Sequence, residues 1–154
     1  MVETVLCYIE KDNQYLMLLR NKKKHDMNAN KYIGVGGHIE NSESKEEALL
    51  REVKEETGLT LLSYIYRGKL LFQNDDFIEV MYLYTSKEFK GEITTCDEGE
   101  LHFIDKNKIL DLSLWEGDRY FLPLLINSDE FIKLKLIYSQ DKLVKVEEWK
   151  DEIH

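Results

Sequence analysis

Apolar and polar positions alternate in short blocks along the first third of the chain. Residues 2–9 and 15–19 are rich in apolar and aromatic side chains, and the turn-forming residues 11–14 separate them. Two such runs around a short polar turn predict a β-hairpin. A polar segment without periodicity follows at 21–30 and leads into a short strand with a glycine turn at 31–37. Three glycines within four residues allow the backbone there to approach another group closely.

The segment 42–57 has the clearest helical pattern. It contains neither Gly nor Pro, is rich in Glu, Lys, Ala, Leu and Arg, and stops at a glycine, which is typical of helix ends. Two N-terminal caps fit the sequence, either Ser42 with Glu46 or Asn41 with Ser44. The sequence therefore predicts one well-defined helix near the middle of the chain.

The remaining apolar runs predict a mostly extended second half with a second, shorter helix. The segment 115–126 is apolar, and Pro123 either interrupts or starts its helix. Extended runs lie at 59–72, 77–84, 101–104, 131–138 and 143–146, the last two forming a closing hairpin. No repeat or linker divides the chain, so residues 1–154 are expected to form a single mixed α/β domain.

The charge of the chain limits the classes of molecule that it is expected to bind. The 154 residues carry a formal net charge of −9, which disfavours binding along bare nucleic acid because each phosphate contact needs a Lys or Arg. A small anionic substrate would have to arrive with a metal ion. Cys7 and Cys96 show no metal-ligand spacing, so both are expected to be reduced and buried. With no apolar stretch long enough for a membrane span, the sequence indicates a cytoplasmic protein without a membrane partner.

Three glutamates share one face of the predicted helix at 42–57. At about 100° per residue, Glu52, Glu55 and Glu56 fall within an arc of roughly 100°. A second arc faces a core and contains Leu49, Leu50 and Val53. Clustered carboxylates repel one another, and they suit either a solvated acidic face or a site for Mg²⁺ or Mn²⁺.

The residues around these glutamates form a known signature. Gly37, Glu43 and the run 51–59 match the pattern G-x5-E-x7-R-E-U-x-E-E-x-G-U, in which U is aliphatic. The chain therefore resembles the Nudix hydrolases. The resemblance implies an α/β/α sandwich with a mixed sheet and metal-dependent cleavage of a nucleoside diphosphate linked to another group. It also implies that the Mg²⁺ ligands are the Gly36 carbonyl with Glu52, Glu55 and Glu56.

The same resemblance gives two residues catalytic roles. Glu52 often bears the role of general base, and Arg51 orients the glutamates. From the residues alone, Arg51 either pairs with Glu43 or a ligating glutamate, or forms an ordinary surface ion pair. Metal-assisted phosphoryl transfer needs clustered carboxylates and little other chemistry from the protein.

Segments outside the signature are similar to the MutT group of 8-oxo-dGTP diphosphatases. They are 31–37, 96–98, 115–118 and 121–125. The resemblance implies that Glu98 is a fourth metal carboxylate, although Asp97 and Glu100 lie close enough to replace it. It also implies that the base is bound by Trp115 and Asp118, whose alternative roles are a core tryptophan and a helix cap.

Further substrate contacts follow from this closer resemblance, which is incomplete. Met27 and Ile33 are expected in the substrate site, and the basic run 22–24 either binds terminal phosphates, with Arg20 and Lys23 as best candidates, or forms a solvated loop. Ile33 and Gly117 stand where human-type members have Asn and Asp, so base specificity does not transfer with the fold. The four histidines share no spacing that would indicate a zinc site.

These patterns lead to a first hypothesis and two alternatives. The first is a Mg²⁺-dependent pyrophosphohydrolase, with Mn²⁺ as a possible substitute, that converts a nucleoside triphosphate such as 8-oxo-dGTP to the monophosphate and pyrophosphate. The second keeps the mechanism but changes the substrate to ADP-ribose, a dinucleoside polyphosphate or a dinucleotide cofactor. The third is a non-catalytic nucleotide sensor. The sequence leaves the oligomeric state open.

Overall fold

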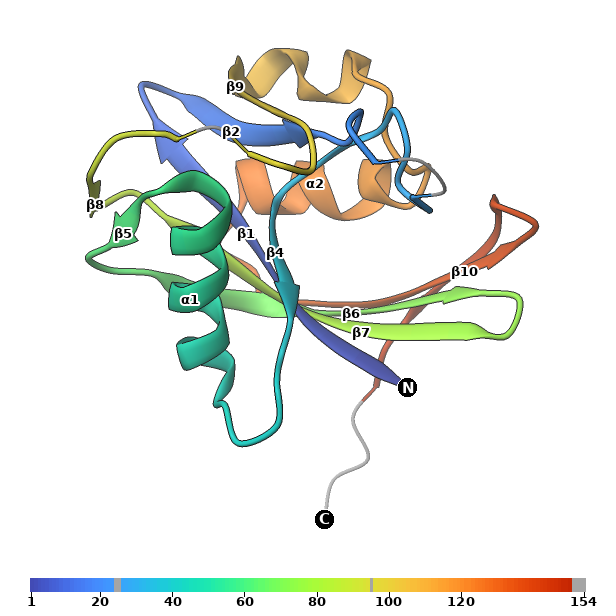
Figure 1. Cartoon of the computed structure of the whole chain (residues 1–154). Coiled ribbons are helices and arrows are strands. Elements are labelled where there is room, and N and C mark those ends of the chain that lie inside the picture. Colours follow the sequence, from blue (N-terminus) through green and yellow to red (C-terminus); the bar gives the residue numbers. More distant parts are fainter. Residues whose placement is uncertain (24–25, 95, 151–154) are drawn as a thin grey trace.

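A mixed β-sheet forms the body of the molecule, and α-helices pack against it (Figure 1). The computed structural model describes residues 1–23, 26–94 and 96–150. The elements in chain order are β1 (Val2–Lys11), β2 (Gln14–Leu19), β3 (Tyr32–Ile33), β4 (Val35–His38), α1 (Lys45–Thr57), β5 (Thr60–Leu61), β6 (Ile65–Asn74), β7 (Phe77–Ser86), β8 (Phe89–Lys90), β9 (Glu100–Asp105), the 3₁₀ helix η1 (Lys106–Asp111), α2 (Asp118–Asn127), β10 (Ile132–Ser139) and β11 (Lys142–Glu148).

The strands follow the order β11-β10-β6-β7-β1-β2-β3, and β4 and β9 pair with β1 and β2. Strand β1 pairs in parallel with β7, as β6 does with β10, and the other pairs are antiparallel. Both predicted hairpins, β1/β2 and β10/β11, are confirmed. The predicted strand at 59–72 is instead split into β5 and β6, because β5 leaves the main sheet to pair with β8.

Alternation along β1 sends side chains to two separate cores. Val5, Cys7 and Ile9 pack with the buried face of α1, whereas Tyr8 packs with α2 and β10 on the other face. The chain is thus a single α/β domain in which the sheet lies between α1 and α2. Both cysteines are free and buried, as predicted.

Helix α1 begins at Lys45, three residues later than the predicted segment. Ser44 is the N-cap: its hydroxyl accepts from the Glu47 N–H, and the Glu47 side chain accepts from the Ser44 N–H, both within 3.0 Å. The predicted caps are therefore wrong, because Ser42 has a left-handed φ of 73°. The helix ends at Gly58 as predicted, with φ 83°. The prediction of a buried Leu50 is also wrong, since it is 40% exposed.

The second helix, α2, contains Pro123 in its interior and is neither started nor interrupted by it. Its N-cap is Gly117, and Asp118 is the first helical residue with no side-chain capping bond, so the alternative role of Asp118 as a cap is wrong. The buried Arg67 guanidinium donates to the Leu125 and Ser128 carbonyls at the other end, at 3.1 and 2.6 Å. These bonds satisfy carbonyls that the helix itself leaves open.

Some sequence predictions fall outside the described part of the chain. These are Lys24 of the basic run, His25 and His154, together with the last residues of the expected domain. Within the described ranges, the helices are too short or too polar to cross a bilayer.

The observed cap, Ser44, and the predicted cap, Ser42, can be distinguished by substitution. We expect Ser44→Ala to lower the free energy of unfolding by about 1 kcal/mol, because it removes the hydroxyl that satisfies the Glu47 N–H. The matched control, Ser42→Ala, should stay within about 0.5 kcal/mol of wild type. Urea unfolding measures both, and a larger loss for Ser42→Ala would contradict the assignment.

Candidate active site

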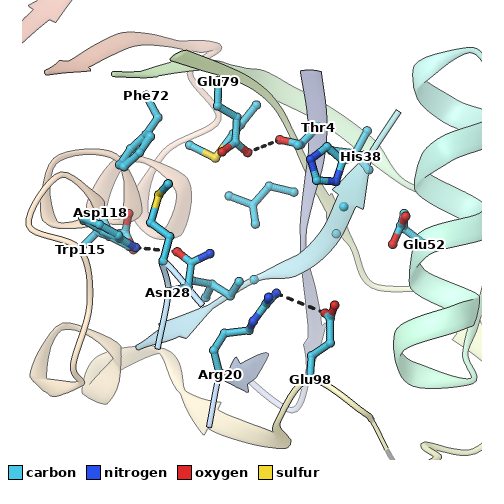
Figure 2. Close-up of a pocket in the computed structure, with 18 of the residues that line it drawn as sticks. Thr4, Arg20, Asn28, His38, Glu52, Phe72, Glu79, Glu98, Trp115 and Asp118 are labelled. Carbon is cyan, nitrogen blue, oxygen red and sulfur yellow. Dashed lines mark hydrogen bonds and ion pairs between the residues drawn. The ribbon is translucent and has the colours of Figure 1, made fainter. Parts of the chain in front are cut away.

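A cavity of about 410 Å³ opens where β1, β4 and α1 meet Arg20, residues 26–28 and Glu98 (Figure 2). This volume suits a small-molecule site. Of the predicted site residues, the cavity brings together Met27, Ile33, Gly36, Glu52, Glu56, Glu98, Trp115 and Asp118. Arg51, Glu55 and Lys23 do not line it.

The acidic end of the cavity holds a pair of carboxyl groups in contact. Glu56 is buried on α1 and accepts from the Gly36 N–H at 2.9 Å. Burial, followed by the hydrogen bond with Glu98, raises the pKa of Glu56 to about 9. The two groups therefore compete for negative charge, and a divalent cation between them would remove this repulsion.

Glu52 lies directly against Gly37 of β4. The predicted glycine turn is wrong, because Gly36 and Gly37 are strand residues held extended by pairing with β1. A Cβ on Gly37 would come within 2.4 Å of the Glu52 Oε2 atom, and one on Gly36 within 1.8 Å of the Val5 carbonyl oxygen. Gly37 therefore lets α1 approach β4, and Gly36 lets β4 approach β1, which is the close backbone approach that the sequence predicted. Burial raises the pKa of Glu52, while Arg51 opposes the shift.

Arg51 fixes the carboxylates from outside the cavity. Its guanidinium binds both Glu43 oxygens at 2.6 and 2.8 Å, and also Glu52 at 2.9 Å and Glu55 at 3.2 Å. A further bond at 3.0 Å joins it to the His38 carbonyl on β4. The hydrogen bond from Arg51 lowers the pKa of Glu43 to about 2. The pairing predicted for Arg51 is present, and it links α1 to the strand beneath it.

The other predicted ionic residues surround this cluster. The Glu55 side chain is 59% exposed and points to Arg51, not into the cavity. Glu98 forms ion pairs with Arg20 and Lys23, each at 3.2 Å, and the Lys23 side chain is 54% exposed. Over residues 1–23, 26–94 and 96–150, no group of three His, Cys, Asp or Glu side chains is arranged to hold a metal ion. The donors nevertheless fit one chemically: they are carboxylate oxygens, and Glu56 and Glu98 lie close enough to hydrogen-bond to each other.

The opposite end of the cavity is aromatic. Trp115 is buried, and its indole N–H donates to the Asn28 Oδ1 atom at 2.7 Å. Phe72 and Tyr138 meet its ring edge-on, with centroids 5.1 and 5.2 Å away. Trp115 therefore belongs to the core and to the cavity wall at once, so the role as a core tryptophan is confirmed and the role in binding a base stays a prediction.

Asp118 reaches the same end of the cavity from α2. Burial raises its pKa from 3.8 to about 7, against the opposing charges of Arg119 and Lys31. A carboxyl group with this pKa can donate as well as accept a hydrogen bond near neutral pH.

Several cavity residues were not predicted. Asn28, which orients Trp115, lies in the polar segment that has no periodicity. Phe72 and Glu79 lie on β6 and β7, where apolar alternation indicates a strand but not which face lines a cavity. No sequence motif marks these three residues.

Comparison with known proteins agrees with this geometry. A model of the NUDIX domain matches residues 2–125, so the chain belongs to the Nudix family, whose members are hydrolases. Nudix hydrolases generally use divalent metal cations. The family and the α/β/α fold predicted from the sequence are thereby confirmed.

Three similar proteins each share less than 30% sequence identity with this chain. A Danio rerio protein named oxidized purine nucleoside triphosphate hydrolase is 28% identical over 130 residues, which cover 83% of each chain. The Mus musculus protein of the same name is 26% identical over 82% of this chain and 83% of its own length. The crystal structure of a MutT protein from Bacillus halodurans has a TM-score of 0.85 and 23% identity, covering 96% of this chain and 97% of its own. That likeness shows the fold.

The buried carboxyl group of Asp118 predicts a pH-dependent stability. The carboxyl group of Asp118 loses its proton near pH 4 in the unfolded chain but only near pH 7 in the folded protein. Between these two pH values the native state therefore keeps a proton that the unfolded chain has lost. Wild-type stability should thus fall over this range as pH rises. Asp118→Asn removes this contribution, so its stability relative to wild type should increase by about 2 kcal/mol from pH 5 to pH 8.

Chemical unfolding at several pH values measures this difference. The exposed Asp129, at the far end of α2, provides the matched control Asp129→Asn. A stability difference for Asp118→Asn that does not change with pH would contradict the raised pKa.

Proposed function

We propose that the protein is a Mg²⁺-dependent pyrophosphohydrolase, with Mn²⁺ as a substitute, that cleaves an oxidised purine nucleoside triphosphate such as 8-oxo-dGTP to the monophosphate and pyrophosphate. The observation that carries this proposal is the cavity itself, which joins an acidic end backed by glycines to an aromatic end. A nucleoside triphosphate has the matching two ends: phosphates that need a cation and a flat base that needs an aromatic partner.

The carboxylates at the acidic end hold the cation in this proposal. The ligands would be Glu52, Glu56, Glu98 and the Gly36 carbonyl, with Glu55 joining them by turning away from Arg51. A divalent cation held there would neutralise phosphate charge and lower the pKa of a water molecule. It would also stabilise the ionised forms of Glu56 and Glu98, which otherwise repel each other.

The remaining polar residues deprotonate the attacking water and position the terminal phosphates. Glu52 accepts the proton of the attacking water, and Arg51 keeps its carboxylate oriented through the bond at 2.9 Å. Arg20 and Lys23, which pair with Glu98, exchange this partner for the terminal phosphates. Each of these groups already lies at the acidic end or on its rim.

The aromatic end binds the base. Trp115 offers a face for stacking, which is worth about 1–3 kcal/mol per base. Met27 and Ile33 line the cavity as apolar contacts, and Asp118 bonds to an edge of the base. The names of the Danio rerio and Mus musculus relatives support an oxidised purine as substrate.

Substitution of the proposed base tests this function. With Mg²⁺ present, we expect Glu52→Gln to lower kcat for pyrophosphate release from 8-oxo-dGTP by about 10²- to 10⁴-fold, because the amide cannot accept the proton. The matched control is Glu148→Gln on β11, an exposed glutamate outside the cavity, which should retain wild-type turnover.

Product analysis completes the assay. The monophosphate and pyrophosphate should appear in equal amounts from one cut, and chelation of the cation should abolish both. Cleavage of ADP-ribose or a dinucleoside polyphosphate in preference to triphosphates would refute the proposed substrate. Nucleotide binding without any turnover across the panel would instead favour a sensor.

A further inference from the structure

A carboxyl group at the sheet side of the cavity has no role in the function proposed above. Glu79 lies on β7, lines the cavity and points into it between Phe72 and Thr4 (Figure 2). The Thr4 hydroxyl on β1 donates to its Oε2 atom at 2.6 Å. Thr4 thus holds the carboxyl group in place through one oxygen and leaves Oε1 to accept a bond from a ligand.

The surroundings of Glu79 make a purely structural role costly. The side chain is partly buried beside apolar residues that line the same cavity, among them Leu6, Phe72 and Met81. Burial raises its pKa, and the opposing influences are the Thr4 hydroxyl and the His38 ring. A carboxyl group in an apolar wall loses favourable hydration, a cost that Leu or Met at the same position would not have. This cost favours a function for Glu79 in ligand recognition.

The chemistry of purines shows what two carboxyl groups in one cavity can distinguish. Guanine has N–H donors on the edge with N1 and N2, whereas N7 is an acceptor. Oxidation at C8 places a hydrogen on N7, so 8-oxoguanine has donors on two edges. A carboxylate accepts from an N7–H group but repels the lone pair of an unmodified N7.

Resting on the proposed function, we propose that Glu79, held by Thr4, acts with Asp118 to select a purine that offers N–H donors on two edges. Each carboxyl group accepts from one edge, and Trp115 covers the ring face. Glu79 is then a specificity-determining residue, and it supplies polar recognition in a chain that has Ile33 and Gly117 at the positions discussed above.

The test compares Glu79→Met, Glu79→Gln and wild type on 8-oxo-dGTP and dGTP. We expect Glu79→Met to lower kcat/KM for 8-oxo-dGTP at least tenfold, mainly through KM, and to change that for dGTP by less than threefold. Glu79→Gln keeps one acceptor oxygen and should lose less. Thr4→Val removes the hydroxyl that holds the carboxyl group and should shift the ratio in the same direction.

The control uses the same kind of hydrogen bond outside the cavity. Glu3 on β1 accepts from the Tyr82 hydroxyl on β7 at 2.6 Å and is exposed. Glu3→Met therefore removes a carboxylate–hydroxyl pair from the same two strands, and it should leave the ratio of kcat/KM values unchanged.

A binding measurement separates this inference from the proposed function. Calorimetry without cation gives the affinities of wild type and Glu79→Met for 8-oxo-dGMP and dGMP. If wild type releases no pyrophosphate from any triphosphate, the proposed function fails, and the monophosphate affinities alone decide the role of Glu79. Equal losses for oxidised and unmodified nucleotides, or no loss for either, would overturn that role.

Discussion

The contact between β4 and the acidic face of α1 is the constraint on which the site depends. Gly36 donates its N–H to Glu56, and Gly37 leaves no room for a side chain beside Glu52. Pairing with β1 fixes both glycines, since Leu6 and Val5 lie opposite Gly36 and Gly37. A side chain on Gly37 would push against the Glu52 carboxylate, and one on Gly36 would collide with the Val5 backbone and disturb the pairing of β4 with β1.

This contact concentrates negative charge, and the neighbouring residues offset it. Arg51 neutralises charge on the outer side through Glu43, Glu52 and Glu55, while on the inner side burial and the hydrogen bond with Glu98 raise the pKa of Glu56. The net charge of −9 therefore overstates the repulsion that a nucleotide meets once a cation has bound. An acidic protein is compatible with a phosphate ligand if the cation comes with it.

The sequence predicts well what short-range physics decides. The helix end at Gly58 and both hairpins follow from local pattern, and the spacing of Glu52 and Glu56 places both on the face that meets β4. The predicted glycine turn was wrong, because pairing with β1 holds Gly36 and Gly37 in a strand. Local rules were less accurate at the start of α1, where Asn41, Ser42 and Ser44 are all residue types that cap helices. The left-handed backbone of Ser42 excludes it as the cap.

Long-range packing accounts for the features that could not be predicted. Asn28 meets Trp115 across 87 positions of sequence, and Thr4 meets Glu79 across 75. Alternation along β7 shows that Glu79 is in a strand, but the side of the sheet with the cavity depends on where α2 and the loops pack. Such pairs are products of the tertiary fold and leave no spacing signal.

The two ends of the cavity also determine the direction in which a nucleotide enters. Both ends contain carboxyl groups, but those at the acidic end can bind a cation, whereas Asp118 and Glu79 lie beside apolar and aromatic walls on separate strands and helices. Phosphates at the aromatic end would face these carboxyl groups without a cation between them and would be repelled. A base with N–H donors gains hydrogen bonds at the same place. In the proposed function, carboxyl groups would therefore meet opposite parts of the substrate at the two ends of the cavity, and charge would disfavour the reversed orientation.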